Sequence, residues 1–211
     1  MSKSSAVSGT EPKVAIIDDH EMIREGFRGL SAHGIHIGAL AETVDDLLSQ
    51  EADPASRSSV AVLDVSLSDR SWVGDNVLRL RDSGYRVVIL TSTALPDALR
   101  EALTAGACAL VAKNDQIGPL VAAIKAVAGG APLYLTYLMA QVIQPSRLAL
   151  REMERDILRY VAGGLTTEQI ASLMSITDDL VESSLRVIAN AYREAYPEPP
   201  ALARNPKASA P

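Results

Sequence analysis

Five polar residues lie at the ends of short apolar runs, where they could form a common site: Asp18, Asp19, Asp64, Thr91 and Lys113. If the runs are parallel strands, their carboxyl ends meet at one edge of a sheet, which is where ligands bind in such folds. Three carboxylates brought close together raise one another's pKa unless a cation neutralises them. Ligation by oxygen alone favours Mg²⁺, so these residues predict a magnesium site.

A carboxylate beside Mg²⁺ can act as a nucleophile toward phosphorus. Lys113 and the metal would then neutralise the phosphoryl oxygens, and the Thr91 hydroxyl would donate a hydrogen bond to one of them. Taken singly, each residue has an ordinary explanation: an acidic pair in a polar loop, a solvated lysine, a capping threonine. Their occurrence together, in this order, indicates a site for phosphoryl chemistry.

The elements that must position these residues follow from the apolar pattern. Short runs rich in Val, Ile, Leu and Ala occupy residues 14–17, 35–40, 60–64, 86–91 and 107–112. Amphipathic segments of helical period separate them, and Gly84, Gly106 and Gly129–Gly130 fall where helices need a left-handed residue to end. Apolar runs alternating with helices predict an α/β doubly wound, five-stranded parallel sheet covering residues 13–128.

The rest of the chain divides into three parts. Residues 129–147 have proline near both ends and no strand pattern, so we expect a linker with a short helix through TYLMAQVI. The helical spacing of apolar residues in 148–196 predicts a small all-α domain of three helices. Residues 1–12 and the Pro- and Ala-rich residues 197–211 are expected to be disordered.

Composition restricts the class of protein. The net charge of the 211 residues is −6, and neither part of the chain is basic. Residues 1–147 hold 13 Lys/Arg against 17 Asp/Glu, and residues 148–211 hold 7 against 9. A generally basic nucleic-acid binder is excluded, so any such contact must come from a local patch.

The single cysteine, Cys108, fits a reducing compartment, and we expect it to be a buried apolar residue. No apolar stretch is long enough for a membrane span, so we expect a cytoplasmic protein without a membrane partner.

Residues 13–128 resemble the receiver domain of a two-component response regulator of the NarL/FixJ type, through VAIIDDHEMIREG, AVLDVSL, VVILTST and ALTAGACALVAKND. The resemblance implies a flavodoxin-like fold and a sensor histidine kinase as partner. It implies Asp64 as the phosphoacceptor, Thr91 as the switch hydroxyl and Lys113 as the phosphate partner. It also implies that Asp18, Asp19 and Asp64, with the backbone carbonyl of Ser66, hold Mg²⁺.

Two features depart from the receiver pattern. Leu110 stands where a switch aromatic usually precedes the lysine by three residues. The loop VSLSDRSWVGDN after Asp64 is longer than usual, and its Trp72 is expected to pack locally or, as the alternative, to anchor a partner. The loop and the IDDH start resemble a subgroup of regulators common in actinobacteria.

Residues 150–192 resemble a LuxR-type helix-turn-helix, through Arg151-Glu152, Glu154-Arg155, the turn VAGGL (161–165) and Ile170-Ala171. Eight aliphatic residues supply a three-helix core: Ile157, Leu158, Val161, Ile170, Leu173, Val181, Leu185 and Ile188. The candidate DNA contacts are Thr166, Thr167, Gln169, Glu182, Ser183, Ser184, Arg186 and Asn190. Glu182 is acidic where the family usually has a lysine, which opposes phosphate contact but can accept a hydrogen bond from cytosine. The usual fourth helix, used for dimer contact, is replaced by PEPPALARNP.

We therefore expect a response regulator that is phosphorylated on Asp64 and controls transcription through DNA, as a homodimer on promoter DNA. It is expected not to be an enzyme, beyond accepting the phosphoryl group and losing it again by its own hydrolysis. One alternative is a regulator whose C-terminal domain binds a protein partner rather than DNA. Another is an unrelated Mg²⁺-dependent phosphoryl-transfer enzyme, which no separate substrate pocket or base motif supports.

Overall fold

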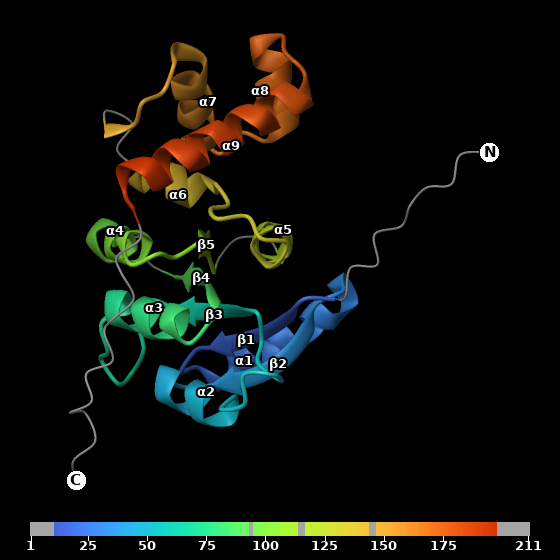
Figure 1. The fold of residues 1–211 in the computed structure, drawn as a ribbon. Helices are drawn as coiled ribbons and strands as arrows, with labels where there is room; N and C mark the ends of the chain where they lie inside the picture. The colour runs from blue at the N-terminus through green and yellow to red at the C-terminus, as the bar shows by residue number, and fades with distance from the viewer. Residues whose placement is uncertain (1–10, 93–94, 114–116, 144–146, 198–211) are drawn as a thin grey trace.

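The computed structural model describes residues 11–92, 95–113, 117–143 and 147–197. Five parallel strands form one sheet in the order β2-β1-β3-β4-β5 (Figure 1). The strands are β1 (Lys13–Ile17), β2 (His36–Ala41), β3 (Val60–Asp64), β4 (Arg86–Thr91) and β5 (Ala109–Ala112). This arrangement confirms the predicted doubly wound parallel sheet. The prediction was possible because strands that are covered on both faces have continuous apolar sequences.

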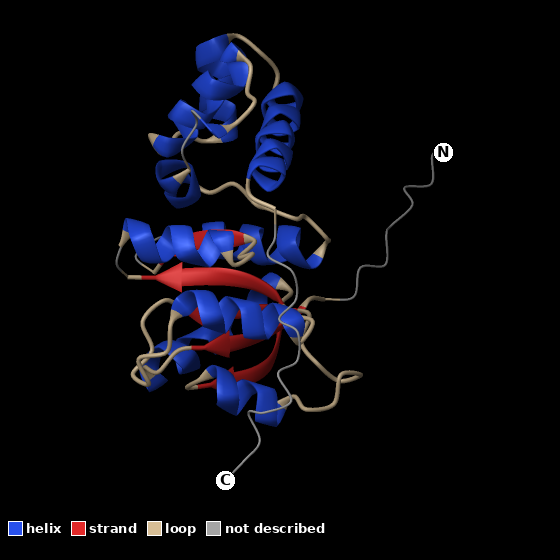
Figure 2. Ribbon diagram, turned by 60° about the vertical axis from the view of Figure 1, so that its left-hand side comes forward, coloured by secondary structure: helices blue, strands red, loops and turns tan. Residues whose placement is uncertain are grey.

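Helices cover both faces of the sheet (Figure 2). The helices are α1 (Glu21–Gly26), α2 (Val44–Gln50), α3 (Val73–Asp82), α4 (Pro96–Thr104) and α5 (Ile117–Ala128), with a 3₁₀ helix η1 (Phe27–His33) after α1. Alternate residues of β1 enter different buried clusters: Val14 and Ile16 pack with α5, while Ala15 and Ile17 pack with α2, α3 and α4. The strand alternation thus places the connecting helices on two opposite faces.

Two elements differ from the sequence prediction. The strand β2 is an edge strand and is only partly buried, so its run is not covered on both faces. The amphipathic segment after β1 is not one α-helix, because it changes to 3₁₀ geometry at Phe27 and ends at Gly34 with φ 70°. Glycine at positions 26 and 29 weakens the α-helix there, because glycine is a poor helix former.

The C-terminal helices are α7 (Glu152–Ala162), α8 (Thr167–Met174) and α9 (Asp178–Ala195). Ser175, with φ 55°, makes the turn after α8, and Thr177 caps α9 by accepting a hydrogen bond from the Leu180 N–H. Most of the predicted three-helix core is buried or half-buried. The exception is Leu173, which is 58% exposed because it lies at the outer side of α8 while Met174 turns inward.

Residues 129–147 do more than link two parts. The Tyr134 N–H donates to the Cys108 carbonyl at 2.8 Å, and the Thr136 hydroxyl donates to the Leu110 carbonyl. These contacts lay residues 134–136 along the free edge of β5. Helix α6 (Tyr137–Val142) follows, confirming the expected short helix, and packs on β5, α4 and α7.

A single buried cluster therefore runs from one face of the sheet through α6 into α7, α8 and α9. Arg193 of α9 also donates from its guanidinium to the carbonyls of Ala107 and Pro132, at 3.1 and 2.7 Å. The C-terminal helices are thereby docked on the sheet and its helices. No helix among the described residues is long and apolar enough to cross a membrane. Most of the expected lead-in and tail lie outside the described residues.

Candidate functional site

The residues expected to do chemistry come together at the carboxyl edge of the sheet. Strands β1, β3, β4 and β5 are neighbours, so Asp18, Asp64, Thr91 and Lys113 all lie at the same edge. The Lys113 N–H donates to the Thr91 carbonyl at 2.7 Å, which ties the ends of β4 and β5 together. We call Asp18, Asp19, Asp64 and Lys113 the acidic pocket.

The lysine lies between two carboxylates. Lys113 Nζ is 2.6 Å from Asp64 Oδ2 and 2.7 Å from Asp18 Oδ2. Burial raises the pKa of Asp64, and the ammonium of Lys113 offsets only part of that shift. Burial lowers the pKa of Lys113, but its hydrogen bonds to Asp18 and Asp64 outweigh burial and raise it. Lys113 is therefore held as a cation where a phosphoryl group on Asp64 would need one.

The donor set fits a divalent cation. One side-chain atom each of Asp18, Asp19, His20 and Asp64 can be chosen so that all four lie within 4.8 Å of one another. A buried oxygen of Asp19, Oδ1, accepts no hydrogen bond from the described residues, although His20 Nδ1 is 2.9 Å away. Clustered carboxylate oxygens with an unsatisfied buried acceptor are a favourable site for a hard metal ion.

Ser66 lies in the turn after β3. Its backbone N–H is directed toward Asp64 Oδ1, at a distance of 3.4 Å. This contact involves the N–H and not the carbonyl, so the carbonyl's role as a metal ligand stays a prediction. Thr91 is buried at the end of β4, with 2% of its surface exposed.

Two neighbours of the acidic pocket were not singled out from the sequence. His20 Nδ1 contacts Asp18 at 3.2 Å as well as Asp19, and Arg24 donates from its guanidinium to the Asp18 carbonyl at 2.6 Å. His20 directly follows the acidic pair, which is a usable signal. Arg24 carries no such signal, because a hydrogen bond from a side chain to a backbone carbonyl does not depend on the type of the accepting residue.

The long loop after β3 presents Trp72, and β5 holds Leu110 at the switch position. Trp72 is 71% exposed, so the prediction that it packs locally is wrong. It forms the N-cap position of α3, where its side chain is directed away from the core. Leu110 is fully buried on β5, within the cluster that continues into α6.

The candidate DNA contacts on α9 divide into two groups. Glu182, Ser183, Arg186 and Asn190 are exposed, and we call these four residues the recognition face. Arg186 pairs with Glu182, with 3.3 Å between nitrogen and oxygen. Ser184 is only 2% exposed, so in this structure it cannot reach DNA as expected, because it falls on the packed side of α9 with Val181 and Ile188.

The start of α8 holds the remaining candidates. Thr166 Oγ1 accepts from the Gln169 N–H at 3.3 Å, and Gln169 Oε1 accepts from the Thr166 N–H at 2.9 Å. These two hydrogen bonds form a capping box, in which both side chains bond to the backbone at the start of α8. Thr167 is half-buried beside them.

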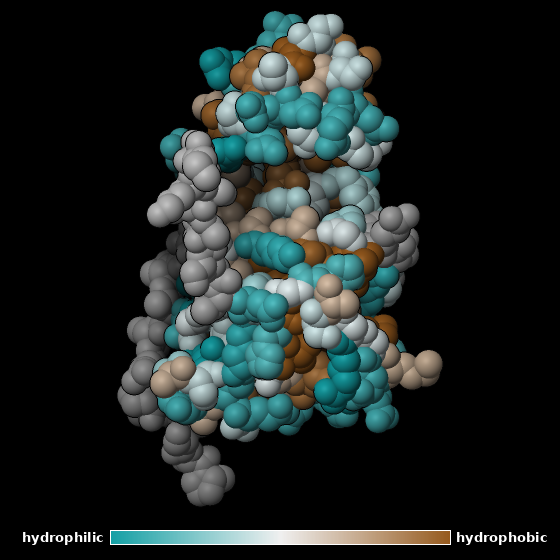
Figure 3. All heavy atoms as spheres, turned by 90° about the vertical axis from the view of Figure 1, so that its right-hand side faces the viewer, coloured by the Kyte–Doolittle hydropathy of each residue, from teal (hydrophilic) through white to brown (hydrophobic). Residues whose placement is uncertain are grey.

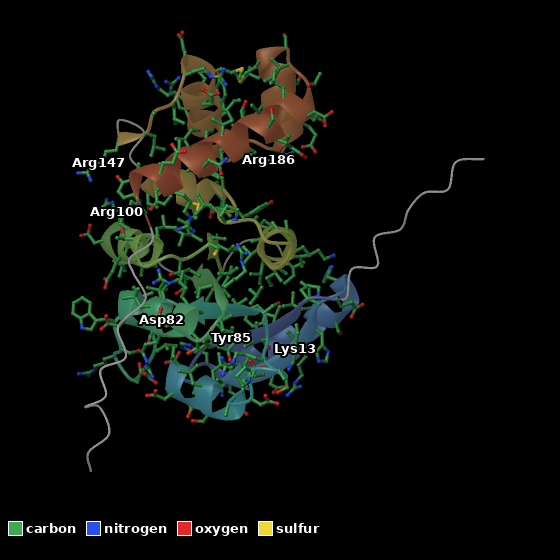
Figure 4. The ribbon with its side chains drawn as sticks, viewed as in Figure 1. Lys13, Asp82, Tyr85, Arg100, Arg147 and Arg186 are labelled. Atoms are coloured by element: carbon green, nitrogen blue, oxygen red, sulfur yellow. The ribbon has the colours of Figure 1, made fainter. Side chains whose placement is uncertain are left out.

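A cavity of about 640 Å³ lies between the C-terminal helices and the segment around α5. Glu182 and Arg186 line it from α9, opposite Ala126 and Tyr134. Figure 3 shows a hollow with apolar residues beneath the C-terminal helices, and Figure 4 labels Arg186 on α9 above the linker. Burial raises the pKa of Tyr134, and the nearby charge of Glu182 raises it further. Part of the recognition face is thus turned toward the linker.

Comparison with known proteins gives relatives that match most of the chain, although no family model matches it. The DNA-binding transcriptional activator DevR/DosR of Mycobacterium tuberculosis is 30% identical over 212 residues, which covers 94% of this chain and 97% of that protein. The transcriptional regulatory protein DesR of Bacillus subtilis is 26% identical and covers 81% of this chain and 76% of its own length. A structure of two RcsB dimers bound to two parallel DNAs has a similar fold, with a TM-score of 0.55, 19% identity, and coverage of 88% of this chain and 98% of that one.

Proposed function

The chain belongs to the NarL/LuxR-type family of transcriptional response regulators, and we propose that a sensor histidine kinase phosphorylates it on Asp64 to control transcription through DNA binding. The observation that carries the proposal is the acidic pocket: Asp64 ends β3 with Lys113 Nζ at 2.6 Å. In this proposal residues 13–128 are the receiver, 129–147 the linker and 148–196 the helix-turn-helix domain. The protein acts in the cytoplasm.

The proposed chemistry is a phosphoryl transfer between two proteins. An Asp64 carboxylate oxygen forms a bond to phosphorus while the bond from phosphorus to the donor's histidine nitrogen breaks. Lys113 pairs with a phosphoryl oxygen, and the Thr91 hydroxyl donates to another. Asp18, Asp19 and Asp64, with the Ser66 carbonyl, would hold Mg²⁺, which when bound supplies positive charge to the phosphoryl oxygens. Hydrolysis of the phosphoaspartate by the protein itself resets the signal, so this reaction is regulatory.

The proposed output is control of transcription, through promoter DNA that a homodimer contacts. The exposed recognition face and the start of α8 (Thr166, Thr167 and Gln169) offer the side chains, and the structure of RcsB dimers on DNA supports this use of the fold. Arg186 can pair with guanine and Asn190 with adenine. We leave Ser184 out of the proposed contacts because it is buried.

The docked arrangement supports control by release. A DNA major groove is about 12 Å wide and must receive the recognition helix. In the docked arrangement Glu182 and Arg186 line an open cavity of about 640 Å³ opposite Tyr134, so a duplex that approaches this side of α9 would meet the linker beside them. Phosphorylation would favour the arrangement in which the C-terminal helices leave the linker.

A second candidate function is binding of a protein partner through the C-terminal helices. The favouring observation is the acidic Glu182, which pairs with Arg186 and thereby reduces the positive charge that the recognition face offers to phosphates.

The test of the proposal is phosphorylation in solution. Purified protein is incubated with acetyl phosphate and Mg²⁺, and the labelled residue is located by mass spectrometry. We expect labelling of wild type and of the control Asp69→Asn, whose carboxylate lies in the exposed loop, and none of Asp64→Asn. Labelling of Asp64→Asn at the wild-type rate would contradict the assignment.

A further inference from the structure

The cavity beneath the C-terminal helices has the size of a small-molecule site. Its volume of about 640 Å³ lies within the range of such sites, which is about 300–1,000 Å³. Its walls come from both parts of the chain, with β5, α5 and the linker on one side and α7, α8 and α9 on the other. A molecule bound there would contact both parts at once.

Most of the cavity wall is apolar. Aliphatic side chains reach it from every one of these elements except α5, which contributes a proline and an alanine. The larger ones are Val111, Leu133, Leu135, Val161, Ile170 and Leu185. Apolar residues are visible inside the hollow in Figure 3. This wall favours a ligand with an apolar body, because burial removes apolar surface from water.

The charged groups at the cavity favour a cation. Among the described residues that line it, the charged ones are Glu168, Glu182 and Arg186, so two carboxylates against one guanidinium leave a net charge of −1. The pKa of Glu168 lies below its ordinary value, because its own backbone N–H and the Thr166 side chain hydrogen-bond to the carboxylate. Both acids are therefore available as anions at neutral pH, and a positively charged ligand complements them.

Tyr134 and Glu182 lie on opposite walls of the cavity. The carboxylate of Glu182 acts on the Tyr134 phenol across this space, since it adds to the rise that burial causes in the phenol's pKa. The Tyr134 hydroxyl makes no hydrogen bond with the described part of the chain. An ammonium group between the two residues would gain an ion pair with Glu182 and a contact with the face of an aromatic ring.

We propose that this cavity binds a small organic cation, an amine with an apolar body, and that Glu182 is the residue that anchors it. The proposal gives a role to an acidic side chain that opposes phosphate contact on the same helix. Because such a ligand touches α9 and the linker together, its binding stabilises the docked arrangement. The inference does not depend on phosphorylation of Asp64.

Three fluorescent probes that share one ring system and differ in charge test the preference of the cavity. They are pyrenemethylamine, pyrenemethanol and pyreneacetate, which are cationic, neutral and anionic. Their affinities for the unphosphorylated full-length protein are measured by fluorescence titration. The variants are Glu182→Gln, the control Glu194→Gln, whose carboxylate is exposed on α9 outside the cavity, and Ala126→Trp, which fills the cavity from α5.

We expect wild type to bind the amine most tightly and the acid most weakly. Glu182→Gln should weaken binding of the amine about 2- to 5-fold, as for a charge pair that water partly screens. It should also tighten binding of the acid, because Arg186 loses its partner. Glu194→Gln should match wild type, and Ala126→Trp should lose binding of all three probes. The inference is overturned if the acid binds as tightly as the amine, if Glu182→Gln leaves the affinity for the amine unchanged, if Ala126→Trp retains binding, or if no probe binds.

Hydrogen exchange tests whether the ligand holds the two parts together. The Tyr134 N–H donates to the Cys108 carbonyl at 2.8 Å, so exchange of this amide requires release of the linker from β5. Saturating pyrenemethylamine should slow this exchange in wild type and leave it unchanged in Ala126→Trp. Unchanged exchange in wild type with the amine bound would overturn the stabilisation of the docked arrangement. Failure of acetyl phosphate to label Asp64 would remove the proposed function and leave these expectations as they are, so the two failures are distinguishable.

Discussion

The hydroxyl of Thr136 makes two contacts that hold the linker against the sheet. It donates to the Leu110 carbonyl on β5 and accepts from the Met139 N–H at 3.2 Å, as the N-cap of α6. Thr136 is 9% exposed, so water does not readily replace either contact. The substitution Thr136→Val keeps the shape of the side chain and removes both contacts.

The size of the effect follows from these contacts. Loss of an N-cap costs about 1 kcal/mol of helix stability. A buried carbonyl left without a donor costs about 1–3 kcal/mol more. The cost at Leu110 applies only while α6 covers β5, because water reaches the carbonyl once the linker leaves. A cost of about 1–3 kcal/mol shifts the equilibrium toward the open arrangement by about 5- to 150-fold.

Two assays on the unphosphorylated protein measure this shift. Chymotrypsin cleaves after aromatic residues, so the rate of cleavage at Tyr134 and Tyr137 alone, followed by the masses of the fragments, reports how often the linker is released. Affinity for the DNA upstream of the protein's own gene reports access to the recognition face. We expect both to rise in Thr136→Val and neither to change in the matched control Thr104→Val, whose hydroxyl is exposed at the end of α4. If Thr136→Val lowers the melting temperature but leaves both quantities at the wild-type value, Thr136 does not hold the docked arrangement.

Two further predictions concern acidic residues away from the pocket. Burial raises the pKa of Glu51, but hydrogen bonds from Ser58 and from Tyr85, labelled in Figure 4, outweigh burial and hold it below its ordinary value. The Glu51 carboxylate therefore stabilises the fold above its unfolded pKa, about 4.3, and this stability is lost as pH falls through the lower folded pKa. The urea midpoint should fall more steeply below about pH 4.3 in wild type than in Glu51→Gln; parallel curves would contradict this. On the recognition face, Glu182→Lys should tighten DNA binding and make the slope of log K against log[salt] more negative by about 1, and Glu194→Lys, at the far end of α9, should not. An unchanged slope in Glu182→Lys would place Glu182 away from the phosphates.

The sheet and the acidic pocket could be predicted from the sequence because their causes are local. A buried parallel strand requires a continuous apolar run, and four of the five runs here end at, or just before, a polar residue of the site: Asp18, Asp64, Thr91 and Lys113. Asp64 and Lys113 are 49 residues apart in the chain, yet the strand order alone brings them within 2.6 Å. The same reasoning predicted α9 from its apolar spacing.

The docking of the linker on β5 could not be predicted in this way. Tyr134 bonds through its backbone N–H, which every residue except proline has, and Thr136 is as ordinary in a loop as at a cap. The prediction for Ser184 failed for a different reason. Ser184 stands three residues after Val181 and four before Ile188, so helical spacing puts it on the apolar face of α9, and only the family resemblance suggested a DNA contact there. Trp72 was expected to pack locally, with a partner anchor as the alternative, but it is 71% exposed at the N-cap position of α3.

The central claim is that the state of Asp64 controls DNA binding by α9. The most direct measurement is the affinity for the DNA upstream of the protein's own gene, at low salt, with and without acetyl phosphate and Mg²⁺, for wild type, Asp64→Asn and Arg186→Ala. We predict salt-dependent binding that tightens on phosphorylation in wild type, does not respond in Asp64→Asn, and is lost in Arg186→Ala. Absence of binding by wild type in both states would contradict the account and favour a protein partner for the C-terminal helices, and equal tightening in Asp64→Asn would remove Asp64 from control.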